Sequence, residues 1–325
     1  DEFAAPPVIL RVDDSVIGTL GNFSASTGKA KSKKTFNVCA IVAAAMTGGT
    51  VLNYSASLPP ERRRILYVDT EQSRFHCKRV LCRILRLAGL PTDVHPPLLE
   101  FLCLRGYATK ERLRKIEEAI YDLDDLGLVV IDGIRDLAHD INSPGEATDL
   151  ITKLMQWTDE RRIHIHTVLH LNKGDDNTRG HLGTELNNKA ETVLQITKDD
   201  FDRDISSVAA MHIRDRDFEP FAFRINADAL PEQVEDYQLR QTTAAKSFDY
   251  AEVCEAKHRE ALELLLSKAD RVSYSSLIGR LQSSYAAIGH SFGINKAKQL
   301  KVFLENKRMI VKEDKFYRYN PDFHY

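Results

Sequence analysis

Hydrophobic and polar positions alternate over the first two thirds of the chain in a pattern that predicts a sheet covered by helices. Runs of apolar residues predict buried strands at 64–69, 128–132 and 163–170. Helical spacing of apolar residues predicts helices between them, at 36–46, 73–88, 110–126 and 145–162. Strands that are apolar on both faces and separated by helices indicate an α/β fold, with a mostly parallel sheet flanked by helices.

The segments on either side of these elements are more polar. Residues 15–22 are expected to be a short lead-in, and 172–189 a polar loop. Three short apolar runs then predict edge strands that pair antiparallel, at 192–197, 206–214 and 221–225. From Pro231 the chain turns polar and loses its periodicity, which predicts a linker over 231–249. The first domain is therefore expected to cover residues 1–230.

A second, smaller domain is expected over residues 250–325. Its pattern predicts helices at 250–267, 273–281 and 294–306, followed by a hairpin of strands at 309–312 and 316–319. Three helices before a hairpin resemble a winged helix-turn-helix, and that resemblance implies binding to duplex DNA. From His290 onward eight Lys and Arg stand against four Asp and Glu. The DNA contacts expected there are Lys296, Lys298, Lys301 and Lys315, although many winged helices serve only protein contacts.

Length, charge and cysteine content narrow the class of protein. The 325 residues suffice for one large and one small domain, and a formal net charge of −2 confines any nucleic-acid site to a local basic patch. Five cysteines occur without a paired or metal-binding spacing, which favours reduced thiols in a cytoplasmic protein. No apolar run approaches the length of a membrane span, so no membrane partner is expected.

One motif points to chemistry. Residues 28–35 read Gly-Lys-Ala-Lys-Ser-Lys-Lys-Thr, which is the phosphate-binding pattern G-x-x-x-x-G-K-[ST] with Lys33 in place of its second glycine. In that pattern Lys34 reaches the terminal phosphates, Thr35 holds Mg²⁺, and backbone N–H groups surround the phosphates at a helix N-terminus. The helix predicted at 36–46 begins at the required place. The alternative is a lysine-rich surface loop.

The ends of the predicted parallel strands carry further polar residues, and in such sheets the chemistry lies at the carboxyl ends. Glu71 follows the first strand and is suited to orient a water molecule for attack on a phosphate. Asp132 ends the second strand and is suited to hold Mg²⁺. His170, with Asn172 and Lys173 after it, stands where a group that senses the terminal phosphate is expected. Turn chemistry or a structural histidine would account for each residue alone.

In this order the motifs resemble RecA-like ATPases, in particular the hexameric replicative-helicase branch with its RepA-type and DnaB-type members. Residues 67–71 (Tyr-Val-Asp-Thr-Glu) are similar to the strand that delivers the catalytic glutamate, and 129–132 (Val-Val-Ile-Asp) to the Walker B strand. The lysine-rich spelling of 28–35 is similar to the phosphate loop of RepA-type members. The segments 170–173 and 179–183 are also similar to that group. The resemblance covers roughly residues 8–226.

What this resemblance implies is an ATP site completed by another subunit. Its nucleotide contacts would be Gly28, Lys29, Ala30, Lys31, Ser32, Lys33, Lys34, Thr35 and Phe36. Arg214 and Arg216, which follow a predicted strand, would reach into the neighbouring subunit's ATP site, unless Asp215 and Asp217 simply pair with them. Lys173 and Arg179 would grip single-stranded DNA from a flexible loop.

We therefore expect a Mg²⁺-dependent ATPase that binds DNA, with ATP and Mg²⁺ as cofactors and a homo-oligomer, possibly a hexamer, as the working form. A helicase-like motor in replication or transfer of a plasmid or mobile element is the function that the resemblance favours. One alternative is a DNA-binding regulator that uses ATP as a switch without unwinding. Another is a degenerate core kept for oligomerisation, with Lys33 blocking normal phosphate binding.

Overall fold

The computed structural model describes residues 4–171, 180–199, 202–235, 237, 250, 253–266 and 271–323. The chain divides into two compact units, residues 1–239 and 240–325. Each unit is described by itself. No helix in these described ranges is long and apolar enough to cross a membrane.

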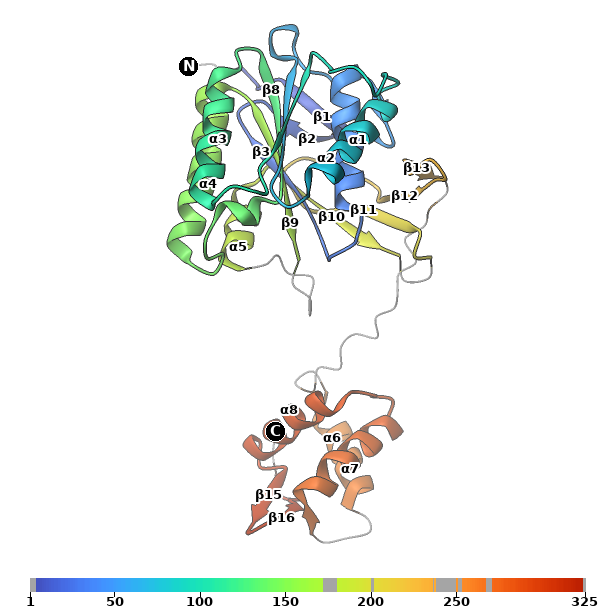
Figure 1. Ribbon diagram of the computed structural model, residues 1–325. Helices are drawn as coiled ribbons and strands as arrows, with labels where there is room; N and C mark the ends of the chain where they lie inside the picture. The colour runs from blue at the N-terminus through green and yellow to red at the C-terminus, as the bar shows by residue number, and fades with distance from the viewer. Residues whose placement is uncertain are drawn as a thin grey trace. The chain divides into compact units, whose positions relative to one another are not determined.

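A nine-stranded sheet forms the centre of the first unit, in the order β13-β12-β11-β10-β3-β9-β8-β6-β7 (Figure 1). The strands from β10 to β7 in this order are parallel, and β11, β12 and β13 are antiparallel. Their bounds are β3 Phe23–Gly28, β6 Arg64–Asp69, β7 Leu99–Cys103, β8 Leu126–Asp132, β9 His164–His170, β10 Thr192–Lys198, β11 Ile205–Ile213, β12 Phe221–Ile225 and β13 Pro231–Val234. The mostly parallel α/β fold expected from the sequence is confirmed.

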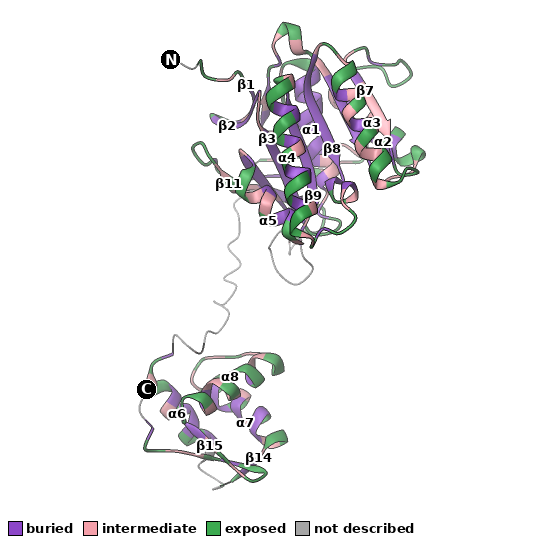
Figure 2. Cartoon of the chain, turned by 90° about the vertical axis from the view of Figure 1, so that its left-hand side faces the viewer, coloured by how far each residue is buried: buried purple, intermediate pink, exposed green. Residues whose placement is uncertain are grey.

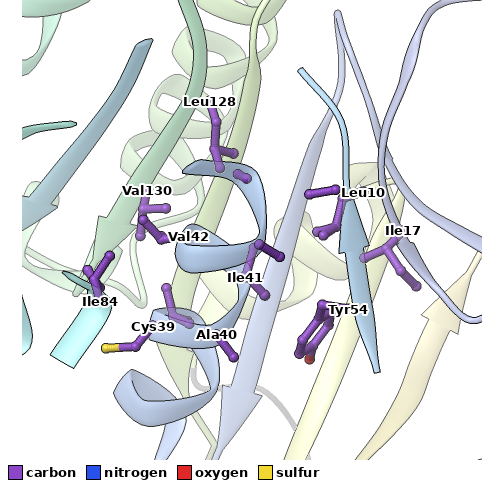
Figure 3. Close-up of a cluster of buried hydrophobic side chains, with 14 of the residues drawn as sticks. Leu10, Ile17, Cys39, Ala40, Ile41, Val42, Tyr54, Ile84, Leu128 and Val130 are labelled. Atoms are coloured by element: carbon purple, nitrogen blue, oxygen red, sulfur yellow. The ribbon is translucent and has the colours of Figure 1, made fainter. Parts of the chain in front are cut away.

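Helices cover both faces of this sheet, as Figure 1 shows. They are α1 Lys34–Thr47 and α2 Arg74–Leu87 on one face, and α3 Thr109–Asp122, α4 Pro144–Arg161 and α5 Gly180–Lys189 on the other. The strand β8 is apolar on both sides: Leu128 and Val130 pack toward α1, and Val129 and Ile131 toward the opposite helices. Figure 3 shows the hydrophobic cluster on the α1 side, with Leu128 and Val130. Figure 2 shows the buried sheet between helices whose outer faces are exposed.

A small antiparallel sheet of order β2-β1-β5-β4 packs on the α1 side. Its strands are β1 Val8–Val12, β2 Ser15–Thr19, β4 Thr50–Val51 and β5 Tyr54–Ala56. Two short 3₁₀ turns complete the unit, η1 Pro60–Arg62 and η2 Ile134–Leu137. Tyr54 is fully buried and donates a hydrogen bond to Asn37 of α1 at 3.0 Å, which ties this sheet to the helix after the phosphate loop.

Four sequence expectations for this unit were wrong in part. Residues 15–19 form a strand and not only a lead-in, and the end of the expected polar loop, 180–189, is α5. The strand at 192–198 lies inside the sheet, parallel to β3, because its apolar residues are buried on both faces. The expected linker begins with β13, which pairs with β12 and closes the sheet edge.

The described residues of the second unit form three helices and a three-stranded antiparallel sheet of order β14-β16-β15. In chain order its elements are α6 Glu255–Leu266, β14 Val272–Ser273, α7 Tyr274–Ala287, α8 Ile294–Asn306, β15 Ile310–Glu313 and β16 Phe316–Tyr319. A separate cluster of buried residues, including Leu262, Leu281, Leu300 and Tyr317, holds them together. The small C-terminal domain therefore has its own core.

Candidate functional site

The loop between β3 and α1 has the tight curvature that a phosphate-binding loop needs. Lys31 and Lys33 both adopt the left-handed conformation, with φ of 65° and 67°. Lys33 therefore takes the backbone shape that the pattern's glycine supplies, at a steric cost of about 1 kcal/mol. Gly28 cannot be replaced so easily, because a Cβ there would lie 2.3 Å from the carbonyl oxygen of Ile196.

Lys34 stands at the first position of α1 and points back across this loop. Its Nζ donates hydrogen bonds to the carbonyl oxygens of Gly28 and Lys29, each at 2.9 Å, and to Nδ1 of His170 at 3.1 Å. Burial lowers the pKa of Lys34 to about 8, although Asp132 and Glu71 pull it upward. The ammonium is thus held over the loop, where an anion can replace carbonyl oxygens as its partner.

Two hydroxyl groups complete the loop. Ser32 Oγ is buried and has no hydrogen-bond partner among the described residues, which is the mark of a donor that awaits an acceptor such as a phosphate oxygen. Thr35 Oγ1 donates to Oδ2 of Asp132 at 2.9 Å, and Tyr67 donates to the same oxygen at 2.9 Å. The loop and the end of β8 are therefore joined through one carboxylate.

Asp132 is 8% exposed and ends β8 in register with Asp69 at the end of β6. Burial, with a smaller contribution from the nearby Asp69, raises the pKa of Asp132 to about 6, although the hydrogen bonds from Tyr67 and Thr35 oppose the rise. A carboxylate that is costly to keep ionised, next to a threonine hydroxyl, is suited to a divalent cation. The oxygen ligands Thr35 and Asp132 therefore fit the Mg²⁺ expected there.

In the described ranges, this site included, no three His, Cys, Asp or Glu side chains stand together as a ready-made metal site. A pair of protein oxygens beside a phosphate loop is the usual arrangement for Mg²⁺, which keeps several water ligands and binds substrate phosphates.

His170 lies between the lysine and the glutamate. Its Nδ1 accepts from the Lys34 ammonium, so the neutral ring carries its proton on Nε2, which lies 3.7 Å from Oε1 of Glu71. The interaction with His170 is the largest cause that lowers the pKa of Glu71. Glu71 is thereby kept ionised and oriented toward the phosphate loop.

The backbone around Glu71 is fixed from the neighbouring strand ends. Oδ1 of Asp69 accepts from the N–H groups of Glu71 and Gln72, at 3.0 and 2.7 Å. Thr70 Oγ1 donates to the carbonyl oxygen of Gly133 at 2.9 Å. A Cβ on Gly133, whose φ is 103°, would lie 2.2 Å from Thr70 Oγ1, so only glycine fits after Asp132. Sequence reasoning missed this role, although a glycine directly after the strand-ending acid was a visible signal.

These groups surround a cavity of about 340 Å³. Its lining residues are Lys31, Lys33, Lys34, Thr35, Phe36, Glu71, Gln72, His76, Arg79, Val80, Arg83, Asp132, Val168 and His170. Away from the phosphate loop the cavity is bounded by α2, where the guanidinium of Arg83 lies 3.7 Å from the centre of the Phe36 ring. Arg79 and Arg83 were not anticipated, because nothing local in α2 shows which of its cations face the loop.

The structure separates the nucleotide contacts expected in the loop into two groups. Lys31, Thr35 and Phe36 line the cavity, whereas Lys29 and Ala30 are exposed and do not. Lys33 borders the cavity, but its Nζ donates to the carbonyl oxygens of Arg203 and Asp204 at 3.2 and 2.5 Å. Its charge is therefore turned toward the β10–β11 connection.

Arg214 and Arg216 lie far from this molecule's own cavity. The residue before Arg214, Ile213, pairs with Thr192 at the start of β10, which pairs with Ser24 near the start of β3. The phosphate loop follows the opposite end of β3. Arg214 donates to the carbonyl oxygen of Lys189 at 3.2 Å, and among the described residues Arg216 has no side-chain hydrogen bond or ion pair.

The lysines expected to contact DNA in the second unit differ in how far their side chains are exposed and free of ion pairs. Lys298 and Lys315 are exposed. Lys301 is largely covered, pairs with Glu305 and lies over the ring of Tyr317 at 5.0 Å, so it is a poor phosphate contact. Lys296 lies over the ring of Tyr250 at 5.1 Å. Lys173 and Arg179 of the first unit lie outside the described residues.

Comparisons with known proteins gave a family match and similar solved structures. A family model described as an AAA domain matches residues 6–176, a range that includes the phosphate loop, Glu71, Asp132 and His170. Among 570 matching chains of solved structures, one is the crystal structure of the RadB recombinase, with a TM-score of 0.47 and 15% identity, covering 66% of this chain and 92% of that chain. A search of curated proteins gave no match.

Proposed function

This chain belongs to the AAA domain family, and we propose that it is a Mg²⁺-dependent ATP-hydrolysing protein that acts on DNA, as a helicase-like motor in replication or transfer of a plasmid or mobile element. One observation carries the proposal: Lys34, Glu71 and Asp132 face a single cavity beside a phosphate loop. These are the side-chain types that phosphoryl transfer to water requires.

Within this site each side chain has a distinct task. Lys34 exchanges its carbonyl partners for phosphate oxygens, and Ser32 supplies a further hydrogen bond. Thr35 and Asp132 hold Mg²⁺, which when bound neutralises charge on the phosphates. Glu71 orients the attacking water molecule and accepts its proton. His170 contacts both Lys34 and Glu71, so it is placed to link phosphate binding to the position of the base.

A second copy of the chain is needed to complete the charge balance of the site. Arg216 is unpaired among the described residues, and its own cavity lies at the other end of the strands. We therefore assign Arg214 and Arg216 to the cavity of a neighbouring copy, where a guanidinium stabilises charge on the transferred phosphoryl group. A homo-oligomer is the active form under this proposal, and hydrolysis should depend on protein concentration.

The second unit is the proposed site for duplex DNA. Its order of helix, short strand, two helices and hairpin supports a winged helix-turn-helix, in which α8 enters the major groove and the β15–β16 hairpin contacts the backbone. Lys298 on α8 and Lys315 in the hairpin are both exposed. Charge reversal of both, Lys298→Glu with Lys315→Glu, should weaken duplex binding and make the affinity depend less steeply on salt, because fewer counterions are released on binding.

The ATPase rate, measured with and without single-stranded DNA over a range of protein concentrations, tests the motor. We expect stimulation by single-stranded DNA, a rate per chain that rises with concentration, and loss of both in Lys34→Ala. Lys110→Ala, an exposed lysine at the start of α3 and outside the cavity, serves as the matched control. ATP hydrolysis that no DNA stimulates would exclude the motor and favour the ATP-switched regulator.

A further inference from the structure

One face of α2 is strongly basic and lacks partners in the described parts of the chain. Helix α2 contains five Lys and Arg and no Asp or Glu. Lys78, Arg79 and Arg86 are exposed and form no ion pair among the described residues, and Phe75 beside them is 69% exposed. Together these four residues are called the basic face. Because these three cations form no ion pair in the described part of the chain, this face favours an acidic partner.

The basic face adjoins the nucleotide cavity. A second cavity of about 310 Å³ lies over it, bounded on the far side by Asp228, Ala229 and Leu230 of the β12–β13 turn. Arg79 and Arg83 line both cavities. A group that approaches the nucleotide cavity from outside along α2 therefore also meets the basic face.

Acidic side chains lie in the segment that carries the two arginines assigned to a neighbour's cavity, and in the turn fastened to that segment. Asp13 and Asp14 lie in the β1–β2 turn, and Asp217 and Glu219 in the β11–β12 connection; these four are called the acidic edge. The two segments are fastened together, because the Val16 N–H donates to Asp215 Oδ2 at 2.8 Å. All four acids are exposed, and none forms an ion pair with Arg214 or Arg216 among the described residues.

The charge pattern of one chain therefore offers two complementary surfaces that cannot meet within that chain. The basic face lies on α2, which follows the carboxyl end of β6, and the acidic edge lies at the opposite end of the sheet. We propose that the acidic edge of one copy docks on the basic face of the next, with Phe75 at the centre of the contact. Docking places Arg214 and Arg216 at the neighbour's nucleotide cavity.

This inference rests on the proposed function, because it names the surfaces that bring the arginines into place. A contact between two different surfaces of identical chains is head-to-tail, so it leads to rings or open filaments and not to a closed two-fold dimer. Opposite charges at the rim of such a contact set its orientation and its sensitivity to salt. Single-stranded nucleic acid is the competing ligand for a face that combines cations with an aromatic ring.

Charge reversal and charge exchange test the contact by sedimentation velocity, with a non-hydrolysable ATP analogue and Mg²⁺. Lys78→Glu with Arg86→Glu reverses the basic face and spares the residues that line the nucleotide cavity. Asp14→Lys with Glu219→Lys reverses the acidic edge. Each double variant should associate about tenfold more weakly or worse. Arg63→Glu with Lys110→Glu changes the net charge by the same amount as the basic-face reversal, but at exposed positions elsewhere. This control should assemble as the wild type does.

Mixing distinguishes a head-to-tail contact from general repulsion. When the two double variants are mixed, one contact joins the intact acidic edge to the intact basic face, and the other joins the two reversed surfaces, whose charges are again opposite. The mixture should therefore assemble, although neither variant assembles alone. The fourfold variant, in which both surfaces exchange sign, should recover assembly. Failure of the fourfold variant to assemble, although it is folded by circular dichroism, would overturn the inference, as would reversed variants that assemble like the wild type.

Nucleotide binding, measured separately with a fluorescent ATP analogue, keeps this test apart from the proposed function. If the wild type does not bind nucleotide, the proposed function fails, whatever the sedimentation result. If it binds nucleotide but stays monomeric at all concentrations, the docking inference fails together with the assignment of Arg214 and Arg216 to a neighbour's cavity, whereas the proposed nucleotide site stands. If reversal of the basic face leaves assembly intact and abolishes binding of a labelled single-stranded oligonucleotide, the occupant is nucleic acid and the inference is wrong.

Discussion

Nucleotide affinity should decline steeply above pH 8, because Lys34 binds phosphates only when it is charged. Its ammonium is buried among carbonyl oxygens, and burial lowers its pKa to about 8. A bound phosphate stabilises the charged form and raises this pKa. Binding at alkaline pH must therefore be accompanied by uptake of one proton, and each unit of pH above the free lysine's pKa weakens binding about tenfold.

The size of this effect follows from the charged fraction of Lys34. With a pKa of about 8, the charged fraction is about 0.76 at pH 7.5 and about 0.03 at pH 9.5. Apparent affinity should therefore fall about 25-fold over that range, which is about 2 kcal/mol of binding free energy. The calculation holds while the lysine in the complex stays protonated.

Titration of a fluorescent ATP analogue at constant ionic strength, at several values between pH 7.5 and 9.5, measures the decline. Calorimetry in two buffers of different ionisation enthalpy counts the protons, and close to one should be taken up at pH 9.5. Lys34→Arg is the control, because a guanidinium stays charged and its weaker binding should not change with pH. A wild-type affinity that is flat over this range would refute the reasoning.

Three further substitutions test the surroundings of the lysine. Asp132→Asn should stabilise the nucleotide-free protein by up to about 3 kcal/mol at pH 7.5, measured by urea unfolding. Burial raises the pKa of Asp132 in the folded protein to about 6, so the cost of burying its ionised carboxylate is fully present above pH 6. At pH 5 the stabilisation by asparagine should be about half as large. Gly133→Ala should cost about 2 kcal/mol of stability and slow hydrolysis, measured by thermal unfolding and ATPase rate, since its Cβ would lie 2.2 Å from Thr70 Oγ1; an unchanged rate would contradict this. Lys33→Gly should change nucleotide affinity less than about threefold. The substitution removes the hydrogen bonds of Lys33 to the β10–β11 connection, but it also removes the steric strain of a non-glycine residue at φ 67°, and the two effects offset each other.

The strands and helices of the core could be predicted wherever local pattern decides them. Continuous apolar runs such as 128–132 are buried on both faces, and that alone places them inside a parallel sheet. The strand at 192–198 was assigned to an edge because its neighbour β3 lies far away in sequence, and pairing between distant segments leaves no local signal. Helix α5 was missed although Leu182 and Leu186 have helical spacing, since the polar residues around them dominate the pattern.

In the candidate site, too, local features could be predicted from the sequence and long-range contacts could not. The order of phosphate loop, glutamate, aspartate and histidine could be read directly, because each residue stands at the end of an element that the pattern predicts. The contacts of Lys33 could not, since they depend on carbonyl groups of the β10–β11 connection. Nor could the stacking of Arg83 on Phe36, which joins two helices that only the folded chain brings together.

The most direct test of the central claim is single-turnover hydrolysis of ATP by the wild type and by Glu71→Gln, with nucleotide affinity measured on the same samples. Glu61→Gln, an exposed glutamate outside the cavity, is the matched control. We predict that all three bind ATP within about threefold of one another, and that only Glu71→Gln slows hydrolysis, by about a hundredfold or more. Equal hydrolysis by the wild type and Glu71→Gln, or a wild type that does not bind ATP, would contradict the account.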